Sequence, residues 1–310
     1  MYRGWGSCCS SGGNDLKDVN LLIMTEDLII KKVGIIGAGT MGNGIAHVSA
    51  LSGFDTVLVD IKDEFVQRGL KTICKNMARQ VKKEKIRQAE MDLSLEKIEI
   101  ATDYLKVSTC DLVVEAVTEN EKIKSDIFKE LDNICQHNTI LASNTSSISI
   151  TKIAASTKRS EKVIGMHFMN PVPIMKLVEV VRGKETSDHT TKAIIDISNK
   201  MSKIPIECND SPGFISNRIL MPMINEAIFC LHEEVGTPEA IDSIMKLGMS
   251  HPMGPLSLAD LIGLDVCLNI INVLFSDLCD DKYKPCPLLV KMVEEGHTGQ
   301  KSGKGFYNYN

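Results

Sequence analysis

The sequence contains no uninterrupted run of about 18 apolar residues, the length that a membrane-spanning helix requires, so we predict no membrane span. It has no excess of basic residues either. The formal net charge is -5 at pH 7, and this acidic balance gives no support for a nucleic-acid partner.

Cysteine spacing of the kind that binds a metal is missing as well. The chain has 10 cysteines, but none of them forms a C-x-x-C pair or a His-paired motif. We therefore predict no metal site and no disulfide scaffold. We expect reduced, mostly buried cysteines, as in proteins of a reducing compartment. Those that follow the first 28 residues are Cys74, Cys110, Cys135, Cys208, Cys230, Cys267, Cys279 and Cys286.

Residues 1–28 have neither the apolar core of a secretory signal nor the arginine-rich, acid-poor composition of a mitochondrial presequence. Arg3 is their only arginine, and their acidic residues are Asp15, Asp18, Glu26 and Asp27. We expect a disordered leader on a cytoplasmic protein; the alternative is the mitochondrial matrix, if the leader is a transit peptide. Met24 offers an alternative start.

The chain has 310 residues, 43% of them apolar and 24% charged, which suffices for one large or two smaller globular domains. A strand predicted at 33–36 is followed by the glycine motif G-A-G-T-M-G at 37–42 and by a helix at 45–51. A second strand at 57–59 ends in Asp60. This order and spacing are typical of a dinucleotide-binding fold.

Each part of this motif has a physical role. Gly37 permits a tight turn, Gly39 lets the backbone approach a pyrophosphate, and Gly42 lets helix and strand pack closely. The amino end of the helix attracts phosphate charge. Asp60 can accept both ribose hydroxyls of NAD and would repel the additional phosphate of NADP, so we predict NAD as the cofactor. Lys62, two residues later, leaves some NADP tolerance open.

A long amphipathic helix is predicted over 63–87, with apolar residues recurring on one face. Four basic residues at i, i+4, i+8 and i+11 form a stripe along it: Lys71, Lys75, Arg79 and Lys82. Such a stripe is either a solvated surface or a site for the phosphates of a bulky carrier such as coenzyme A. The pattern alone favours neither.

Three further strands are predicted at 112–116, 140–143 and 163–166, with amphipathic helices between them. Each strand runs into polar residues. Ligands of a parallel, doubly wound (Rossmann-type) α/β sheet bind at the carboxyl ends of its strands, so this topology gathers the polar residues beside the glycine motif. The residues placed there are Glu119, Asn144, Ser146 and His167.

His167 and Glu179 lie on two apolar runs that a turn-rich linker joins. Histidine can take and return a proton near neutral pH, and a carboxylate beside its other ring nitrogen fixes the tautomer and stabilises the protonated form. Taken alone, the segment favours a structural histidine and a solvent-facing glutamate, because single residues of both types are common. Beside a predicted dinucleotide site, it favours a catalytic pair that faces the nicotinamide.

After Asp210-Ser211-Pro212-Gly213 the pattern changes to helices only, predicted at 214–234, 238–248 and 256–278. We therefore divide the chain into the leader (1–28), an NAD-binding domain (29–209) and an all-helical carboxyl-terminal domain (210–310). The apolar character of these helices predicts dimerisation through the second domain.

Several blocks of the sequence together resemble the 3-hydroxyacyl-CoA dehydrogenase family in its short, two-domain form. The blocks are G-A-G-T-M-G (37–42), L-V-V-E-A-V-T-E-N (112–120), A-S-N-T-S-S (142–147), H-F-M-N-P-V-P-I-M-K-L-V-E (167–179), S-P-G-F-I-S-N-R (211–218) and H-P-M-G-P (251–255). The resemblance extends from about residue 31 to Tyr309. It implies a homodimeric enzyme that reversibly oxidises an (S)-3-hydroxyacyl-CoA with NAD, in fatty-acid or butanoate metabolism.

The resemblance also assigns site residues. The family's catalytic His and Glu fall on His167 and Glu179, and its substrate-contacting Ser and Asn fall on Ser146 and Asn217. The basic stripe becomes a candidate site for the phosphates of coenzyme A. The cofactor contacts implied by the motif and the resemblance are Gly37, Gly39, Thr40, Met41, Gly42, Asp60, Glu119, Lys124 and Asn144.

Three other interpretations stay open. An NADP-preferring enzyme that works in the reductive direction would use the same residues. A dehydrogenase of free β-hydroxy acids has a similar two-domain plan but typically relies on a central lysine, and the His167–Glu179 pair argues against it. A non-catalytic NAD-binding protein would tolerate the loss of catalytic residues, and none is lost here.

Overall fold

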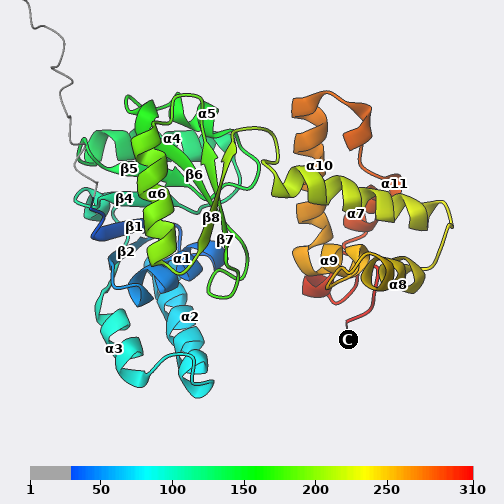
Figure 1. Ribbon diagram of the computed structural model, residues 1–310, viewed down its shortest axis with the longest axis horizontal. Coiled ribbons are helices and arrows are strands. Elements are labelled where there is room, and N and C mark those ends of the chain that lie inside the picture. The colour runs from blue at the N-terminus through cyan, green and yellow to red at the C-terminus, as the bar shows by residue number, and fades with distance from the viewer. Residues whose placement is uncertain (1–28, 310) are drawn as a thin grey trace, which may run out of the picture.

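A computed structural model describes residues 29–309, which form an α/β lobe followed by a lobe of helices (Figure 1). The predicted leader, residues 1–28, lies outside the described residues. The strands are β1 (Lys32–Ile36), β2 (Asp55–Val59), β3 (Ile98–Ala101), β4 (Leu112–Glu115), β5 (Ile140–Ser143), β6 (Val163–Phe168), β7 (Leu177–Arg182) and β8 (Ile204–Asn209). The helices are α1 (Thr40–Leu51), α2 (Asp63–Lys82), α3 (Gln88–Glu96), α4 (Glu121–Ile134), α5 (Ile150–Ala154), α6 (Asp188–Lys200), α7 (Ser216–His232), α8 (Pro238–Gly248), α9 (Pro255–Ile262), α10 (Leu264–Leu278) and α11 (Pro287–Glu294).

The strands form one sheet in the order β3-β2-β1-β4-β5-β6-β7-β8. All neighbouring strands are parallel except β6 and β7, which are antiparallel. The chain passes from β1 to β2 on one side and places β4 on the other, so the carboxyl ends of β1 and β4 flank the topological switch point, where Rossmann-type sheets bind ligands. The predicted doubly wound, mainly parallel sheet is confirmed.

Apolar side chains of the sheet divide between two layers, because successive strand residues point to opposite faces. Ile35 and Leu58 belong to the layer that α1, α2 and α6 cover, whereas Ile36 and Val57 belong to the layer beneath α4 and α5. The second lobe has a separate core made by α7, α9, α10 and α11. Each lobe therefore buries its own apolar surface.

The single helix predicted over 63–87 is wrong. α2 ends at Lys82, Glu84 adopts a left-handed φ of 55°, and the chain turns back into α3. The reversal lets Met91 and Leu95 pack on the same apolar layer as α2, which a straight helix could not do. The short strand β3 then adds to the sheet edge beside β2, and the sequence pattern did not reveal it.

The helix predicted at 256–278 is divided as well. Gly263, with a φ of 105°, separates α9 from α10, and the two helices meet at 98°. Within 29–309 no single helix is long and apolar enough to span a membrane; α9 and α10 meet the length and composition test only as this bent pair. The helical lobe also contains isolated β-bridges, from Lys304 to Gly299 and to Asn308.

The described cysteines are free thiols and most are buried, as predicted. The buried ones are Cys110, Cys135, Cys208, Cys267 and Cys286.

Candidate active site

His167 and Glu179 lie side by side on adjacent strands. β6 and β7 are antiparallel, and their register pairs these two residues directly, so both side chains point to the same face of the sheet. Nδ1 of His167 lies 2.7 Å from Oε2 of Glu179. His167 is 6% exposed and Glu179 is 3% exposed. The proximity that the sequence predicted therefore follows from strand register.

Ser216, the first residue of α7, holds the same carboxylate. Its backbone N–H donates to Oε1 of Glu179 at 2.9 Å, and its hydroxyl donates to Oε2 at 2.7 Å. Burial alone would raise the pKa of Glu179, but the hydrogen bonds from His167 and Ser216 outweigh burial, and the pKa lies below its usual value. An ionised carboxylate only accepts hydrogen bonds, so Nδ1 of His167 carries a proton and Nε2 is left to exchange one.

Residues at the start of the helical lobe complete the surroundings of His167. The ring of Phe214 meets the His167 ring edge-on, with 5.8 Å between centroids. Asn217 donates from Nδ2 to the backbone oxygen of Ser146 at 2.9 Å. Asn144 accepts a hydrogen bond from the backbone N–H of Phe168 at 2.9 Å, which fixes the end of β6 beside the end of β5. The sequence predicted this grouping of polar residues but not the contribution of Phe214 or Ser216.

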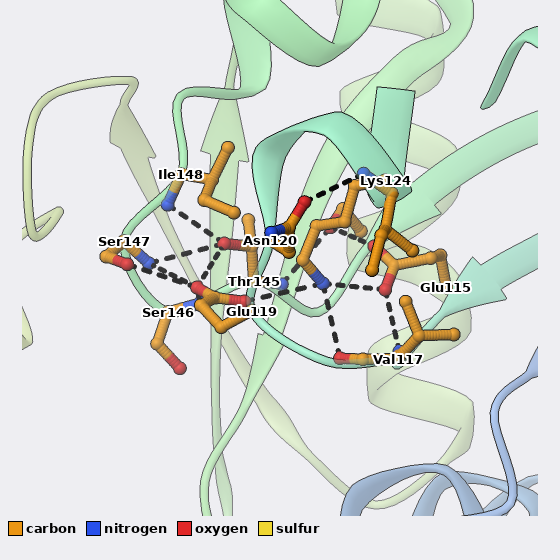
Figure 2. A network of polar contacts seen from close by, with 11 residues as sticks. Glu115, Val117, Glu119, Asn120, Lys124, Thr145, Ser146, Ser147 and Ile148 are labelled. Carbon is orange, nitrogen blue, oxygen red and sulfur yellow. Dashed lines mark hydrogen bonds and ion pairs between the residues drawn. The ribbon is translucent and has the colours of Figure 1, made fainter. Parts of the chain in front are cut away.

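A buried charge network supports the loops after β4 and β5 (Figure 2). Nζ of Lys124 lies 2.6 Å from Oε1 of Glu115 and 3.4 Å from Oε2 of Glu119. Lys124 is 1% exposed and Glu115 is fully buried. The second carboxylate oxygen of Glu115 accepts the hydroxyl of Ser143 at 2.7 Å. One ammonium thus pairs with two carboxylates, one at the end of β4 and one in the loop that follows it.

Glu119 carries this network into the loop after β5. Its Oε1 accepts the hydroxyl of Thr145 at 2.6 Å, the N–H of Ser146 at 2.8 Å, and both the N–H and hydroxyl of Ser147 at 3.1 Å. Burial alone would raise the pKa of Glu119, but Lys124 and these donors outweigh it and lower the pKa. Figure 2 shows the side chain of Ser146 pointing away from the network, so its hydroxyl is not used there.

The glycine loop is built for close approach of a ligand. Gly37 has a φ of 100°, and a side chain at Gly42 would collide with the Gly37 backbone oxygen, so both positions need glycine. A Cβ at Gly39 would meet no described atom within 4 Å, and α1 has no side-chain cap and no acidic residue in its first turn. The N–H groups at this helix end are therefore open to an anion.

Asp60 lies next to this loop. It accepts the N–H of Ala38 at 2.7 Å through Oδ2 and the N–H of Ile61 at 2.7 Å through Oδ1. Each oxygen keeps a further lone pair for a ribose hydroxyl. Met41 instead packs against the core, and the half-buried position of its side chain suits a structural role. The loop, the open helix end and the acid together fit a dinucleotide.

Two hollows meet at Gly39. One, of about 540 Å³, includes Asp60, Phe65, Tyr104 and Val117 in its wall. The other, of about 390 Å³, runs between α1, α2 and the loop that joins β6 to β7. Its polar lining is Thr40, Asn43, Arg68, Thr72, Asn76 and Asn170.

The predicted basic stripe does not form the wall of the second hollow, to which α2 contributes Arg68, Gly69, Thr72 and Asn76. Lys71, Lys75, Arg79 and Lys82 are all exposed on α2. Arg68 and Thr72, which line the hollow, lie on the same side of the helix as Lys75 and Arg79 by helical spacing. Arg68, Thr72 and Asn76 were not predicted as site residues, although their i, i+4, i+8 spacing forms a second polar row beside the stripe.

Two protein-family models together match nearly all of the described chain. The model described as "3-hydroxyacyl-CoA dehydrogenase, NAD binding domain" matches residues 32–211, and "3-hydroxyacyl-CoA dehydrogenase, C-terminal domain" matches residues 213–309. The chain belongs to the 3-hydroxyacyl-CoA dehydrogenase family. It is an NAD-dependent oxidoreductase, as the resemblance implied.

Individual members of the family are similar over nearly their full length. The chain is 56% identical over 278 residues to a probable 3-hydroxybutyryl-CoA dehydrogenase of Deinococcus radiodurans, covering 90% of this chain and 100% of the relative. It is 42% identical over 291 residues to human mitochondrial hydroxyacyl-coenzyme A dehydrogenase, covering 92% and 93% of the two chains. A crystal structure of (S)-3-hydroxybutyryl-CoA dehydrogenase from Ralstonia eutropha shares its fold, with a TM-score of 0.88, 50% identity, and coverage of 91% and 100%.

Proposed function

We propose that this dehydrogenase reversibly oxidises a short-chain (S)-3-hydroxyacyl-CoA, such as 3-hydroxybutanoyl-CoA, to the 3-oxoacyl-CoA. The buried His167–Glu179 pair carries the proposal, since it supplies a proton acceptor held in one tautomer at the sheet edge that also bears the dinucleotide loop. Relatives at 53–56% identity bear the name 3-hydroxybutyryl-CoA dehydrogenase, which supports the substrate class.

His167 acts as the base in oxidation. Its Nε2 takes the proton of the C3 hydroxyl as the C3 oxygen becomes a carbonyl. NAD, when bound, would supply the acceptor for the C3 hydride. Glu179 holds Nδ1–H and stabilises the imidazolium that forms. In reduction the same Nε2 returns the proton.

Ser146 and Asn217 are proposed to hydrogen-bond the oxygens that gain negative charge in reduction, the C3 oxygen and the thioester carbonyl. The hydroxyl of Ser146 is turned away from the Glu119 network (Figure 2). Asn217 uses one of its two Nδ2 hydrogens on Ser146, which leaves the second for a ligand.

The residues that would hold NAD are the loop 37–42 and Asp60. Glu119, Lys124 and Asn144 are proposed to serve the nicotinamide half chiefly by fixing the loops around it, because their polar atoms bond to other residues of the chain. The stripe of α2 is proposed to hold phosphates of coenzyme A, since by helical spacing Lys75 and Arg79 lie on the same side of the helix as Arg68 and Thr72, which line the second hollow. We also keep the division into 29–209 and 210–310 as a proposal.

The test of this function is the loss of NADH absorbance with acetoacetyl-CoA. We expect turnover with the CoA ester and none with free acetoacetate at the same concentration. A parallel series with NADPH measures cofactor preference, and we expect NADH to be used better because Asp60 would repel the ribose phosphate.

The controls separate the alternative functions. Equal turnover of free acetoacetate would favour a β-hydroxyacid dehydrogenase. Tight NADH binding without any turnover would favour a non-catalytic NAD-binding protein. A series of longer 3-oxoacyl-CoA esters then defines the preferred chain length.

We further propose that the helical lobe forms a homodimer. Large apolar side chains protrude from α8 and its flanks, among them Leu247, which is 87% exposed, and Val235, Ile244 and Met249. Beside them, a hollow of about 380 Å³ between α7 and α8 is lined mainly by apolar side chains. An exposed apolar patch of this kind is typical of a protein interface.

Light scattering tests the dimer, for which we expect twice the mass of one chain. Leu247→Asp should shift the mass towards a single chain, because it places a charge in the proposed interface. Leu93→Asp on α3 is the matched control, since Leu93 is also a well-exposed leucine but lies on the α/β lobe. A single-chain mass for the unaltered protein would remove the proposal.

A further inference from the structure

Ser216 makes an unusual pair of contacts for the first residue of a helix. α7 has no side-chain cap of its own, and its first N–H groups lack partners within the helix. The Glu179 carboxylate, which belongs to the other lobe, takes the place of a cap by accepting both the N–H and the hydroxyl of Ser216. One carboxylate thus serves His167 and the start of α7 together.

The chain geometry before α7 directs Ser216 towards this carboxylate. Gly213 and Phe214 have φ values of 74° and 51°, so the chain enters α7 through two consecutive left-handed residues. Phe214 is buried although such a conformation is costly for a bulky residue. Its ring packs on His167, and this contact and the Ser216 hydrogen bonds both depend on the same turn.

We infer that Ser216 is a positioning residue for the reaction: its two hydrogen bonds fix the Glu179 carboxylate against His167, so that docking of the helical lobe completes the catalytic pair. Oε2 of Glu179 accepts from Nδ1 of His167 and from the Ser216 hydroxyl at the same time. A second donor on that oxygen disperses its negative charge and limits how strongly it holds the Nδ1 proton. Ser216 therefore sets the orientation of Glu179 and shares the carboxylate oxygen that His167 uses.

Cys208 on β8 is a titratable neighbour of Glu179 that faces the pair from another strand. Burial and the nearby Glu179 carboxylate raise the pKa of its thiol to about 11, so it stays neutral in the assay range. A shift of the pH profile in a Ser216 variant is therefore not a titration of this thiol.

The experiment compares the pH dependence of kcat for 3-hydroxybutanoyl-CoA oxidation in Ser216→Ala, Ser216→Thr and the unaltered enzyme. In Ser216→Ala we expect kcat to fall roughly tenfold with KM changed less, because a hydrogen bond to a charged group is lost. The acid limb of the profile should move up by roughly 0.5 to 1 pH unit, because a less solvated carboxylate stabilises the imidazolium more. Ser216→Thr keeps the hydroxyl and should restore both values.

Ser257→Ala is the matched control. Ser257 also donates its N–H and hydroxyl to a buried carboxylate, at 2.9 and 2.6 Å from Oδ2 of Asp242, but it lies within the helical lobe. This variant should lose stability without moving the pH profile. If Ser216→Ala does not fold, Ser216→Cys gives the same comparison, because a thiol has a similar shape and donates weakly.

A second measurement uses the double variant Ser216→Ala/His167→Gln. Removal of the Ser216 hydroxyl should then lower kcat little further, because the effects of residues that act through one another are not additive. The inference rests on the proposed function, and the outcomes separate the two. No turnover by the unaltered enzyme counts against the function. Turnover with an unmoved Ser216→Ala profile, or without rescue by Ser216→Thr, overturns the role of Ser216.

Discussion

Replacing His167 with glutamine is expected to lower turnover of acetoacetyl-CoA by roughly two to four orders of magnitude while NADH binding is nearly unchanged. Glutamine can still donate a hydrogen bond to Glu179, but it cannot take or return a proton. His167 lies at the carboxyl end of β6, and its Nδ1 is already committed to Glu179, so the loss acts on proton exchange at Nε2. Steady-state kinetics and the change in NADH fluorescence on binding measure the two effects separately.

His47→Gln is the control for the removal of a buried imidazole. His47 is fully buried in α1, its Nε2 lies 3.2 Å from Oε1 of Gln80, and burial lowers its pKa to about 4, so it is neutral near pH 7. This variant should keep turnover within about threefold of the unaltered enzyme, as expected for a residue outside the reaction. If His167→Gln retained turnover at the level of His47→Gln, the assignment of the base would be wrong.

The sheet, and the edge of it at which His167 lies, were predictable because their signals are local. Short apolar strands that end in polar residues, together with a glycine motif, define the order of a parallel sheet and the edge at which its ligands bind. The distance between His167 and Glu179 has no such local signal, since it depends on the register of β6 and β7. A slip of one residue would have turned Glu179 to the opposite face.

Other features depend on contacts between distant segments, and the sequence does not display these. The end of α2 at Lys82 has no proline or glycine to mark it; it is set by the packing of Met91 and Leu95 back onto the sheet. Ser216 looks like an ordinary residue at a helix start, because its partner Glu179 lies in the other lobe. Tertiary packing, rather than local preference, decides both.

Lys124 was predicted only as a cofactor contact, although its position in the sequence also indicates a buried ion pair. Within α4 it lies three residues before Ile127 and seven before Leu131, which places it on the apolar face of an amphipathic helix. A lysine at such a position is either snorkelling to the surface or paired inside the protein. The structure shows the second arrangement, with Glu115 and Glu119 as partners (Figure 2).

Replacing Lys124 with methionine is therefore expected to destabilise the fold by roughly 3–5 kcal/mol at neutral pH, as found when one member of a buried ion pair is removed. The change keeps the length of the side chain but leaves the buried Glu115 and the neighbouring Glu119 without their cation. Chemical denaturation at pH 7 measures the loss. The loop at 145–147 should loosen as well, because Glu119 anchors it.

The pH dependence of the free energy of unfolding of Lys124→Met shows whether lost charge pairing or lost packing destabilises the fold. With Lys124 present, the pKa of Glu119 is lowered, so its contribution to stability is present above its unfolded pKa and is lost as the pH falls through the folded pKa. Without Lys124, carboxylates buried beside no cation bind protons more readily when folded, and the stability deficit should shrink as the pH falls from about 7 to about 5. A deficit that stayed constant over this range would point to lost packing instead.

Two further variants decide between charge and packing. Lys122→Met changes an exposed lysine on the same helix and should alter stability by no more than about 0.5 kcal/mol. Adding Glu115→Gln to Lys124→Met removes the fully buried carboxylate and should recover a large part of the loss, because the penalty comes from the uncompensated charge rather than from the missing ammonium. The double variant could instead be less stable than Lys124→Met alone. In that case Glu115 would stabilise the fold mainly by accepting hydrogen bonds from Ser143 and Val117, and Lys124 would act chiefly by holding Glu115 in place for them.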